Sequence, residues 1–292
     1  MSEYPTDDTE TDKKSHACLY IVATPIGNLE DISSRAIATL KSADYIAAED
    51  TRHSGRLLAH FNITTPVIAY HDHSNAKRLQ KISELLSEGK SVALISDAGT
   101  PLISDPGYQL VKEARGQQVQ VVPIPGPCAI VAALSAAGIP SDRFVFEGFL
   151  PAKATARQTQ LNALAQEPRT LIFYESTHRL LDSLSDMISV FGGERIATIA
   201  RELTKTYETI LSGSLAELLE VVSEDTNQQK GEFVLLVAGY KTSDEQRVIN
   251  TEVEQTMRIL LDELPIKQAA AIGAKLTGLK KRDLYQWALG LK

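Results

Sequence analysis

The sequence contains few cysteines and few aromatic residues, and it has no long apolar segment. Only Cys18 and Cys128 occur among 292 residues, and each lies in or beside an apolar run. Such sparse cysteine excludes a disulfide framework and is typical of a reducing compartment. No uncharged apolar stretch reaches the ~18 residues that a membrane-spanning helix needs. We therefore expect a soluble, cytoplasmic protein that is not bound to a membrane.

The common signatures of nucleotide and metal binding are also missing. Neither G-x-G-x-x-G nor G-x-x-x-x-G-K-[ST] occurs, so neither a dinucleotide site nor a P-loop is indicated. His71 and His73 flank Asp72, and His53 and His60 precede them. A short H-x-H at the end of a strand is more often polar surface than a metal site. We therefore expect no bound metal.

Charge is unevenly distributed along the chain. The net charge of -7 does not favour a broadly basic surface that binds nucleic acid. Residues 266–292 nevertheless contain six Lys or Arg and a single acidic residue, Asp283. The first 16 residues are polar and acidic, without the basic and then apolar order of a signal peptide, and we expect a disordered tail. The basic C-terminal segment stands out on an otherwise acidic protein.

Short β-rich runs alternate with amphipathic segments in the first half of the chain. Expected strands are 18–23, 44–48, 66–70, 91–96 and 118–124, and expected helices are 32–43, 75–89, 107–116 and 127–138. Within 75–89, the apolar side chains of Leu79, Ile82 and Leu86 follow the spacing of one helix face. This alternation predicts a mostly parallel sheet that is covered by helices.

The pattern changes after SDRFVFEGFLPAK at 141–153. Strands are expected at 170–176, 195–202, 207–213 and 232–240, and helices at 178–192 and 214–222. Because consecutive strands here can pair directly, we expect a mixed sheet. After a polar segment at 241–246 the pattern becomes helical, for example at 253–264. The predicted organisation is a tail (1–16), two α/β domains (17–139 and 140–241) and a small helical domain (242–292).

The most informative stretch is ALISDAGTPLISDPG at 93–107. Its apolar start leads directly into two Asp, two Gly, two Pro and several hydroxyl side chains. In open α/β sheets, ligands bind beyond the carboxyl ends of the strands, where this polar cluster falls. Turns of similar composition are expected at 24–31, 49–55 and 124–129. Any one of them could simply turn the chain, but four at one sheet edge predict a rigid ligand pocket.

Eight short motifs occur in order along residues 18–240: TPIGNL, AEDTR, SDAGTPLISDPG, PGP, EGFLP, FYES with HR, RELTK and KGEFVLLV. As a set they closely resemble the tetrapyrrole methylase superfamily, and within it the branch that methylates small-subunit ribosomal RNA. The resemblance implies two α/β domains with S-adenosylmethionine (SAM) in the cleft between them, and a homodimer. It also implies 2′-O-methylation of a cytidine ribose in the decoding region of 16S rRNA, in the small ribosomal subunit.

The resemblance also assigns cofactor contacts to positions of this sequence. Thr100 stands where the superfamily's Gly-Asp-Pro turn has its Asp, so Asp97 or Asp105 can take over the contacts of that carboxylate. Segments 174–176 and 231–232 match further cofactor-facing segments. The implied cofactor-binding residues are Thr24, Pro25, Gly27, Asp97, Ala98, Gly99, Thr100, Pro101, Ile103, Ser104, Asp105, Pro127, Cys128, Ser176 and Leu203.

Two motifs supply the candidate catalytic residues. Methyl transfer to a ribose hydroxyl is an in-line displacement, which the protein aids mainly by orienting the reactants, and a general base assists it. The candidates in AEDTRH and RELTKTY are Glu49, Asp50, Arg52, Glu202 and Lys205, with His53 and Tyr207 as further possible bases. Arg52, Arg201 and Lys205 can also hold RNA phosphates. The structural alternative for AEDTR is a helix start, because Asp50 or Thr51 suits an N-cap.

The basic segment 264–289 has the plan of a helix-turn-helix. Ala269, Ala270 and Ala271 give a small, packable helix face, Gly278 lies in the expected turn, and the KKR at 280–282 opens the second helix. Such a helix can place basic side chains on phosphates. The alternative is a plain amphipathic hairpin.

Two other functions stay open from the sequence. One is SAM-dependent methylation of a tetrapyrrole or another small molecule, which the basic tail and the EGFLP and RELTK motifs do not favour. The other is a non-catalytic RNA-binding protein whose α/β part only senses a ligand. Formation of a methylated product would separate an enzyme from such a binding protein.

Overall fold

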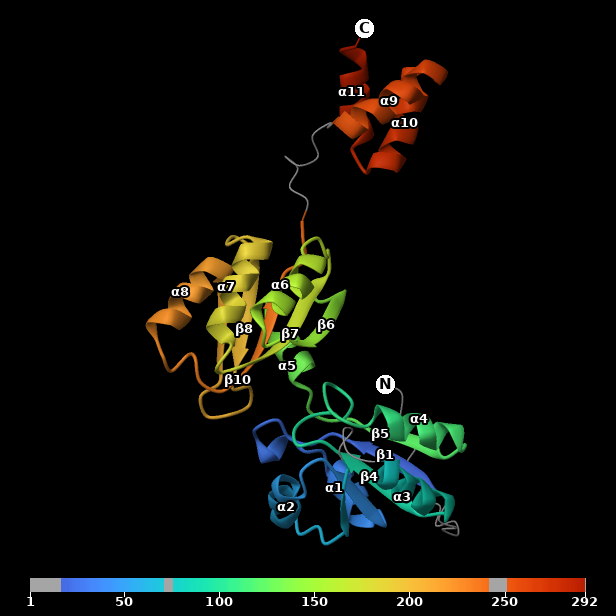
Figure 1. Ribbon diagram of the computed structural model, residues 1–292, viewed down its shortest axis with the longest axis vertical. Coiled ribbons are helices and arrows are strands. Elements are labelled where there is room, and N and C mark those ends of the chain that lie inside the picture. Colours follow the sequence, from blue (N-terminus) through green and yellow to red (C-terminus); the bar gives the residue numbers. More distant parts are fainter. Residues whose placement is uncertain (1–16, 71–75, 242–250, 292) are drawn as a thin grey trace, which may run out of the picture. The chain divides into compact units, whose positions relative to one another are not determined.

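The computed structural model describes residues 17–70, 76–241 and 251–291 (Figure 1). The chain divides into two compact units, residues 1–239 and residues 240–292. The first unit contains two five-stranded sheets, and the described part of the second unit is helical. The predicted boundary at 139/140 falls inside the first unit, between its two sheets, and stays a prediction.

The first sheet is parallel throughout, with the strand order β3-β2-β4-β1-β5. Its strands are β1 (Cys18–Val22), β2 (Tyr45–Ala48), β3 (Val67–Ala69), β4 (Ser91–Ile95) and β5 (Gln120–Ile124). Apolar runs such as YIAA in β2 are typical of parallel strands that are buried on both faces. Because the strands are parallel, their carboxyl ends meet at one edge of the sheet.

Helices cover both faces of this sheet (Figure 1). They are α1 (Ser34–Ser42), α2 (Thr51–His60), α3 (Ala76–Ser87) and α4 (Tyr108–Gly116), with a short 3-10 turn at Leu29–Asp31. Leu40 of α1 and Leu58 of α2 pack on one face with Ile46 and Ile95. The helices α3 and α4 pack on the other face, in a cluster that includes Leu94. Alternate residues of β4 therefore enter two separate cores.

The second sheet is mixed, with the strand order β6-β7-β10-β8-β9. Its strands are β6 (Phe144–Phe149), β7 (Thr170–Ser176), β8 (Ile196–Arg201), β9 (Thr209–Ser214) and β10 (Glu232–Val237). Only the β6–β7 pair is parallel, and β7–β10, β10–β8 and β8–β9 are antiparallel. This agrees with the predicted mixed sheet.

Three helices cover one face of the second sheet: α6 (Ala154–Ala163), α7 (Leu180–Phe191) and α8 (Leu215–Glu224). The opposite face packs against α5 (Ala129–Ala136), which follows the last strand of the first sheet. Thr198 Oγ1 of β8 donates a hydrogen bond to the carbonyl of Ala137 at the end of α5 (3.0 Å). Helix α5 thus belongs to the second sheet although it begins at the edge of the first.

The second unit consists of α9 (Thr251–Glu263), α10 (Ile266–Thr277) and α11 (Lys281–Leu289) within the described range. Gly273 lets α9 and α10 approach closely, because a Cβ there would collide with Sδ of Met257. Gly278 caps α10 in the left-handed conformation with φ 73°, and α11 starts three residues later. This is the helix–turn–helix plan expected for 264–289.

The sequence missed two helices and one strand. It treated 49–55 as a turn, but α2 begins at Thr51 because the Asp50 side chain accepts hydrogen bonds from two backbone N–H groups of the first helical turn. The turn interpretation of 49–55 was wrong, whereas the alternative, a helix start capped by Asp50, is confirmed. The segment 141–153 was given no element, although β6 occupies 144–149, and α6 was not expected. Across the described ranges, no helix is both long and apolar enough to cross a membrane.

Candidate functional site

Four loops leave the carboxyl edge of the first sheet, after β1, β2, β4 and β5, as the sequence predicts. Hydrogen bonds connect these loops to one another. Thr24 and Gly99 exchange backbone hydrogen bonds of 2.8 and 3.1 Å, and Thr100 Oγ1 donates to the carbonyl of Pro127 (2.9 Å). The backbone N–H of Asp50 donates to Oδ1 of Asp97 (3.0 Å). The four loops therefore form one connected rim.

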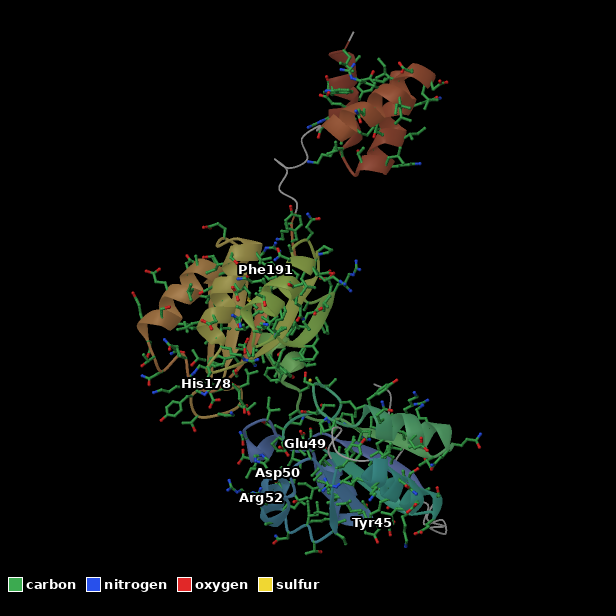
Figure 2. All side chains as sticks on the ribbon, in the orientation of Figure 1. Tyr45, Glu49, Asp50, Arg52, His178 and Phe191 are labelled. Carbon is green, nitrogen blue, oxygen red and sulfur yellow. The ribbon has the colours of Figure 1, made fainter. Side chains whose placement is uncertain are left out.

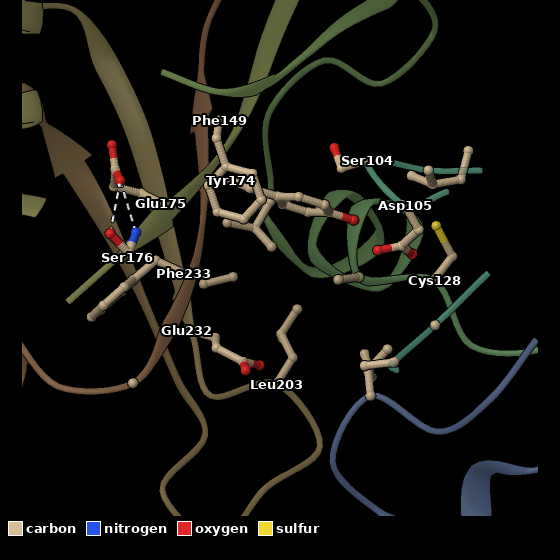
Figure 3. Close-up of a pocket in the computed structure, with 18 of the residues that line it drawn as sticks. Ser104, Asp105, Cys128, Phe149, Tyr174, Glu175, Ser176, Leu203, Glu232 and Phe233 are labelled. Atoms are coloured by element: carbon tan, nitrogen blue, oxygen red, sulfur yellow. Dashed lines mark hydrogen bonds between the residues drawn. The ribbon is translucent and has the colours of Figure 1, made fainter. Parts of the chain in front are cut away.

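A cavity of about 450 Å³ lies between this rim and the second sheet (Figure 3). Its size is typical of a small-molecule site. Ten of the residues that the sequence assigned to cofactor binding line it: Asp97, Ala98, Gly99, Thr100, Ile103, Ser104, Asp105, Cys128, Ser176 and Leu203. Residues far apart in the chain thus meet at one cavity.

The other five assigned residues, Thr24, Pro25, Gly27, Pro101 and Pro127, are not among its lining. At least three of them shape the loops that do line it. Thr24 forms backbone hydrogen bonds with Gly99, and the carbonyl of Pro127 accepts a hydrogen bond from the Thr100 hydroxyl. A Cβ on Gly27 would lie 2.5 Å from Cγ of Lys205, so glycine permits the close approach of the RELTK loop. Their cofactor contacts stay predictions.

The loop after β4 has an unusual backbone. Gly99 has φ 83°, and the non-glycine residues Leu102 and Ser104 have φ 73° and 65°. Left-handed conformations cost non-glycine residues about 1–2 kcal/mol each and persist where the surrounding structure enforces them. Such strained residues cluster at functional sites, and here they lie in or beside the cavity wall.

Carboxylates line both sides of the cavity: Asp97 and Asp105 on the first-sheet loop, and Glu175 and Glu232, which are ion-paired with Arg179 and Lys205, on the second sheet. Burial, together with the negative charges of Glu49 and Asp97, raises the pKa of Asp105 to about 6, although a hydrogen bond with Ser96 opposes the shift. Within the lining there is no Lys or Arg side chain. A positively charged ligand would relieve this repulsion between carboxylates.

The second sheet contributes larger side chains. Tyr174, Phe149, Phe233 and Leu203 line the cavity, and Figure 3 shows the Tyr174 ring extending toward Asp105. Burial, together with the charges of Cys128 and Asp105, raises the pKa of the Tyr174 hydroxyl well above its usual range. The Tyr174 hydroxyl therefore stays protonated and neutral at physiological pH, and its ring forms an apolar part of the cavity wall that ends in a polar group.

The RELTK loop closes one side of the site. Lys205 Nζ donates to Glu202 Oε1 (2.9 Å) and to Glu232 Oε2 (3.0 Å), and Glu232 lines the cavity. Burial lowers the pKa of Lys205, but the hydrogen bonds to both carboxylates outweigh it, so the pKa is raised. Glu202 shows the opposite balance, because Lys205 and the Glu232 N–H lower its pKa despite burial. Both groups are charged near neutral pH.

The AEDTR candidates lie at the start of α2. Figure 2 labels Glu49, Asp50 and Arg52 there. None of the three is among the cavity-lining residues. Asp50 Oδ1 accepts the backbone N–H groups of Arg52 (2.7 Å) and His53 (3.2 Å), and these hydrogen bonds lower its pKa. Asp50 therefore acts as the N-cap that the structural alternative described, and its catalytic role stays a prediction.

The histidines that the sequence singled out are described only in part. His71 and His73 lie outside the described residues. Among the residues that are described, no group of three or more His, Cys, Asp or Glu could hold a metal ion.

The sequence also missed lining residues. Ile26, Ala129, Phe149 and Phe233 line the cavity without having been assigned. For three of them a signal existed, because Phe149 lies in EGFLP, Ile26 in TPIGNL and Phe233 in KGEFVLLV. Ala129, which lies just outside the PGP motif, follows only from the way in which the chain folds.

Comparison with known proteins defines first the class of protein. The profile of the family "Tetrapyrrole (Corrin/Porphyrin) Methylases" matches residues 18–219, and that of the "RsmI C-terminal HTH domain" matches residues 248–292. A uroporphyrin-III-C-methyltransferase from Thermus thermophilus is similar with a TM-score of 0.55 and 19% identity, over 76% of this chain and 94% of that one. A diphthine synthase is similar with a TM-score of 0.57 and 14% identity, over 78% and 92%. The fold is that of the tetrapyrrole methylases.

Sequence relatives then narrow the class. A ribosomal RNA small subunit methyltransferase I from Pseudomonas aeruginosa is 57% identical over 94% of this chain and 98% of the relative. The protein of that name from Vibrio cholerae is 55% identical over 97% and 98%. The chain belongs to the ribosomal RNA small subunit methyltransferase I family.

Proposed function

We propose that this protein transfers a methyl group from SAM to the 2′-oxygen of a cytidine ribose in the decoding region of 16S rRNA. It would act in the cytoplasm on the small ribosomal subunit. The proposal is supported by high identity along nearly the whole chain to relatives named ribosomal RNA small subunit methyltransferase I. The structural observation that carries it is a cavity rich in carboxylates and small residues at the carboxyl edge of a parallel sheet.

The cavity fits SAM in size and charge. SAM bears a positive sulfur and an ammonium group, and the lining offers Asp97 and Asp105 without any Lys or Arg; Glu232 also lines the cavity but is ion-paired with Lys205. Ala98 and Gly99 leave the backbone accessible to the polar end of the cofactor. Ile26, Ile103 and Leu203 offer an apolar surface to its adenine. When bound, SAM supplies a methyl group activated by the adjacent positive sulfur.

The protein's own part is to orient the two reactants. An in-line displacement gains up to roughly 7–11 kcal/mol from correct placement alone. The four connected loops and the strained backbone at Leu102 and Ser104 supply a rigid wall for this purpose. Lys205 stays protonated, so we assign it to holding an RNA phosphate or ribose oxygen at the cavity's edge and not to accepting the proton.

Substitutions at the two leading catalytic candidates test their roles. Lys205→Ala and Asp50→Ala should keep SAM binding, measured by calorimetry, and lose methyl transfer. Asp50→Asn is the matched variant, because asparagine also caps helices well. Full activity in Asp50→Asn would mean that Asp50 serves only as the cap, and wild-type rates in both alanine variants would overturn the assignment.

Methyl transfer itself is tested with purified protein, tritium-labelled SAM and small ribosomal subunits from a strain that lacks the protein. We expect label in 16S rRNA, in a ribose linkage that resists alkali. Absence of label despite measurable SAM binding would refute the proposed reaction and favour a small-molecule acceptor.

The helical unit would contribute to binding the subunit. Lys280, Lys281 and Arg282 are exposed at the start of α11, where they can reach phosphates. Deletion of residues 242–292 should weaken subunit binding and leave SAM affinity unchanged. Unaltered subunit binding would refute this role.

We also propose a homodimer. On the α5 side of the second sheet, Val131, Ile196 and Ile210 are 61%, 50% and 36% exposed. A second copy would cover such apolar side chains. Analytical ultracentrifugation should give about twice the chain mass, and a monomer at micromolar concentration would contradict the proposal.

A further inference from the structure

We propose that Phe149 is the surface on which the base of the target nucleotide stacks during methylation. The proposal rests on the RNA-methylating function proposed above and extends it to a residue that positions the substrate. Phe149 ends β6, lines the cavity and is 51% exposed. A half-exposed phenyl ring on a cavity wall presents an apolar face that a planar base can cover.

The backbone aims this ring into the site. The β6–β7 pairing is irregular between Phe146 and Gly148, and Gly148 has φ 69°. Glycine adopts this left-handed conformation without strain, and a Cβ at Gly148 would lie in ordinary contact with Oγ of Ser104 (3.4 Å), so the end of β6 runs beside the strained loop of the first sheet. Bulges of this kind redirect side chains next to active sites.

The ring has defined neighbours on the protein side. Its centroid lies 5.5 Å from that of Tyr174, with an interplanar angle of 59°. The guanidinium carbon of Arg179 lies 5.8 Å from the Phe149 centroid. These contacts fix the ring orientation while half of the residue stays accessible, as a stacking surface requires.

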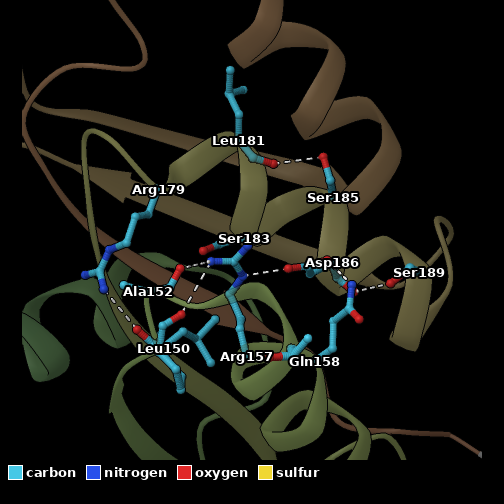
Figure 4. Close-up of polar contacts among 12 residues, drawn as sticks. Leu150, Ala152, Arg157, Gln158, Arg179, Leu181, Ser183, Ser185, Asp186 and Ser189 are labelled. Atoms are coloured by element: carbon cyan, nitrogen blue, oxygen red, sulfur yellow. Dashed lines mark hydrogen bonds and ion pairs between the residues drawn. The ribbon is translucent and has the colours of Figure 1, made fainter.

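Two arginines lock the chain directly after Phe149 (Figure 4). Arg179 Nη1 donates to the carbonyl of Leu150 (3.0 Å), and Arg157 Nη1 donates to those of Pro151 (3.4 Å) and Ala152 (3.3 Å). Arg157 is itself 3% exposed and paired with Asp186 at 2.6 Å. Arg179 Nε lies 3.1 Å from Oε1 of the buried Glu175.

This rigid support explains the EGFLP motif. Leu150 is 1% exposed and anchors the segment in the core, whereas the preceding phenylalanine is left half in solvent. A core role would bury the ring. A binding role needs it fixed and accessible, which is the observed arrangement.

The charges around the cavity distinguish the two groups that could stack on Phe149, the base of the target nucleotide and the adenine of SAM. Asp97 and Asp105, which would attract the cationic cofactor, lie on the first-sheet loop. The second sheet, which carries Phe149, also contributes the carboxylates Glu175 and Glu232, but these are ion-paired with Arg179 and Lys205. A neutral cytosine needs no such charge and gains from aromatic stacking, which is the common way of holding unpaired RNA bases. The observations therefore favour the substrate base over the adenine of SAM.

The test compares Phe149→Ala, Phe149→Leu and Phe149→Trp with the wild type. We expect the alanine and leucine variants to raise KM for small subunits by about 5- to 100-fold, because they remove one stacking interaction. Phe149→Trp should restore KM to within about threefold of wild type, and SAM affinity by calorimetry should stay within about twofold in all three variants. Phe144→Ala is the matched control, since Phe144 lies on the same strand, is 43% exposed and does not line the cavity.

Each other result overturns the inference. A loss of SAM affinity in Phe149→Ala would assign the ring to the cofactor. An unchanged KM, or a leucine variant equal to wild type, would exclude stacking. Failure of the wild-type protein to methylate rRNA would instead refute the proposed function, so the two failures are distinguishable.

Discussion

The two sheets of residues 1–239 contribute to the cavity in different ways. The parallel sheet contributes loops: small residues, left-handed backbone and carboxylates between Asp97 and Asp105. The mixed sheet contributes side chains carried near its strands, such as Phe149, Tyr174 and Glu232. A parallel sheet gathers its loops at one edge, so backbone can approach a ligand there. A strand fixes a large side chain more firmly than a loop does. We infer that the loops of the first sheet, together with the RELTK loop and its Leu203, serve the cofactor, and that Phe149 of the second sheet presents the substrate.

The largest effect is expected from breaking the support of the second sheet. Arg157→Met leaves Asp186, 13% exposed, without its buried cation. We expect a loss of about 3 kcal/mol or more in the free energy of unfolding, because an uncompensated buried charge is costly. Urea denaturation measures it. The double variant Arg157→Met with Asp186→Leu should recover much of the loss, and an equally unstable double variant would contradict the ion-pair explanation.

Next in size is a change of backbone in the first sheet's loop. Gly99→Val places a branched side chain at φ 83°, where a Cβ already lies 3.3 Å from Cγ2 of Ile26. We expect SAM affinity to fall on the order of 100-fold, because the strain of about 1–2 kcal/mol adds to the space that valine fills. Gly55→Ala, in α2 with nothing within 4 Å of its Cβ, is the control and should bind SAM normally. If calorimetry gives the same SAM affinity for both variants, this loop does not bind the cofactor.

A pH effect of about tenfold should identify Asp105. Its pKa of about 6 means that the carboxylate which attracts a cation is lost as pH falls through that value. SAM affinity should therefore be about tenfold weaker at pH 5 than at pH 7.5, and Asp105→Asn should be weaker but show a flat pH profile.

The same shift has a consequence for stability. Because the folded-state pKa of Asp105 exceeds its ordinary value of 3.8, ionisation of the folded protein costs stability as pH rises from about 4 to about 6. At pH 7.5 the free energy of unfolding of Asp105→Asn should thus be up to about 2 kcal/mol higher than that of the wild type. Below pH 4 the two free energies of unfolding should be equal. A destabilised variant at pH 7.5 would contradict the burial of a charge at this position.

The smallest effect concerns the helical unit. Lys281→Glu with Arg282→Glu should weaken small-subunit binding by about tenfold at moderate salt and reduce its salt dependence, because two phosphate contacts are lost. Lys41→Glu with Lys112→Glu, at exposed lysines of α1 and α4, changes the net charge by the same amount and is the control in a filter-binding assay. Equal losses in both variants would mean that net charge alone matters.

The sequence predicted the edge of the first sheet well, because strands and helices alternate and the polar cluster directly follows SVALI. It placed Asp97 through Asp105 beside the cavity for the same reason. The start of α2 was visible locally, since Asp50 suits an N-cap, but the small residues around it also suited a turn.

Other features depend on contacts between distant residues. Phe149 faces the cavity because Gly148 bends β6 and because arginines at positions 157 and 179 hold the residues that follow it. Gly27 matters through Lys205, which is 178 positions away in the numbering of the chain. No local pattern reveals such pairs.

Hydrogen–deuterium exchange of the full-length protein, with and without saturating SAM, tests the division of labour most directly. We predict that SAM slows exchange in the first-sheet loops 97–107 and 124–130 and in the RELTK loop 201–205, with no change in 251–291. Protection confined to 251–291, or no protection in the loop 97–107, would contradict the account.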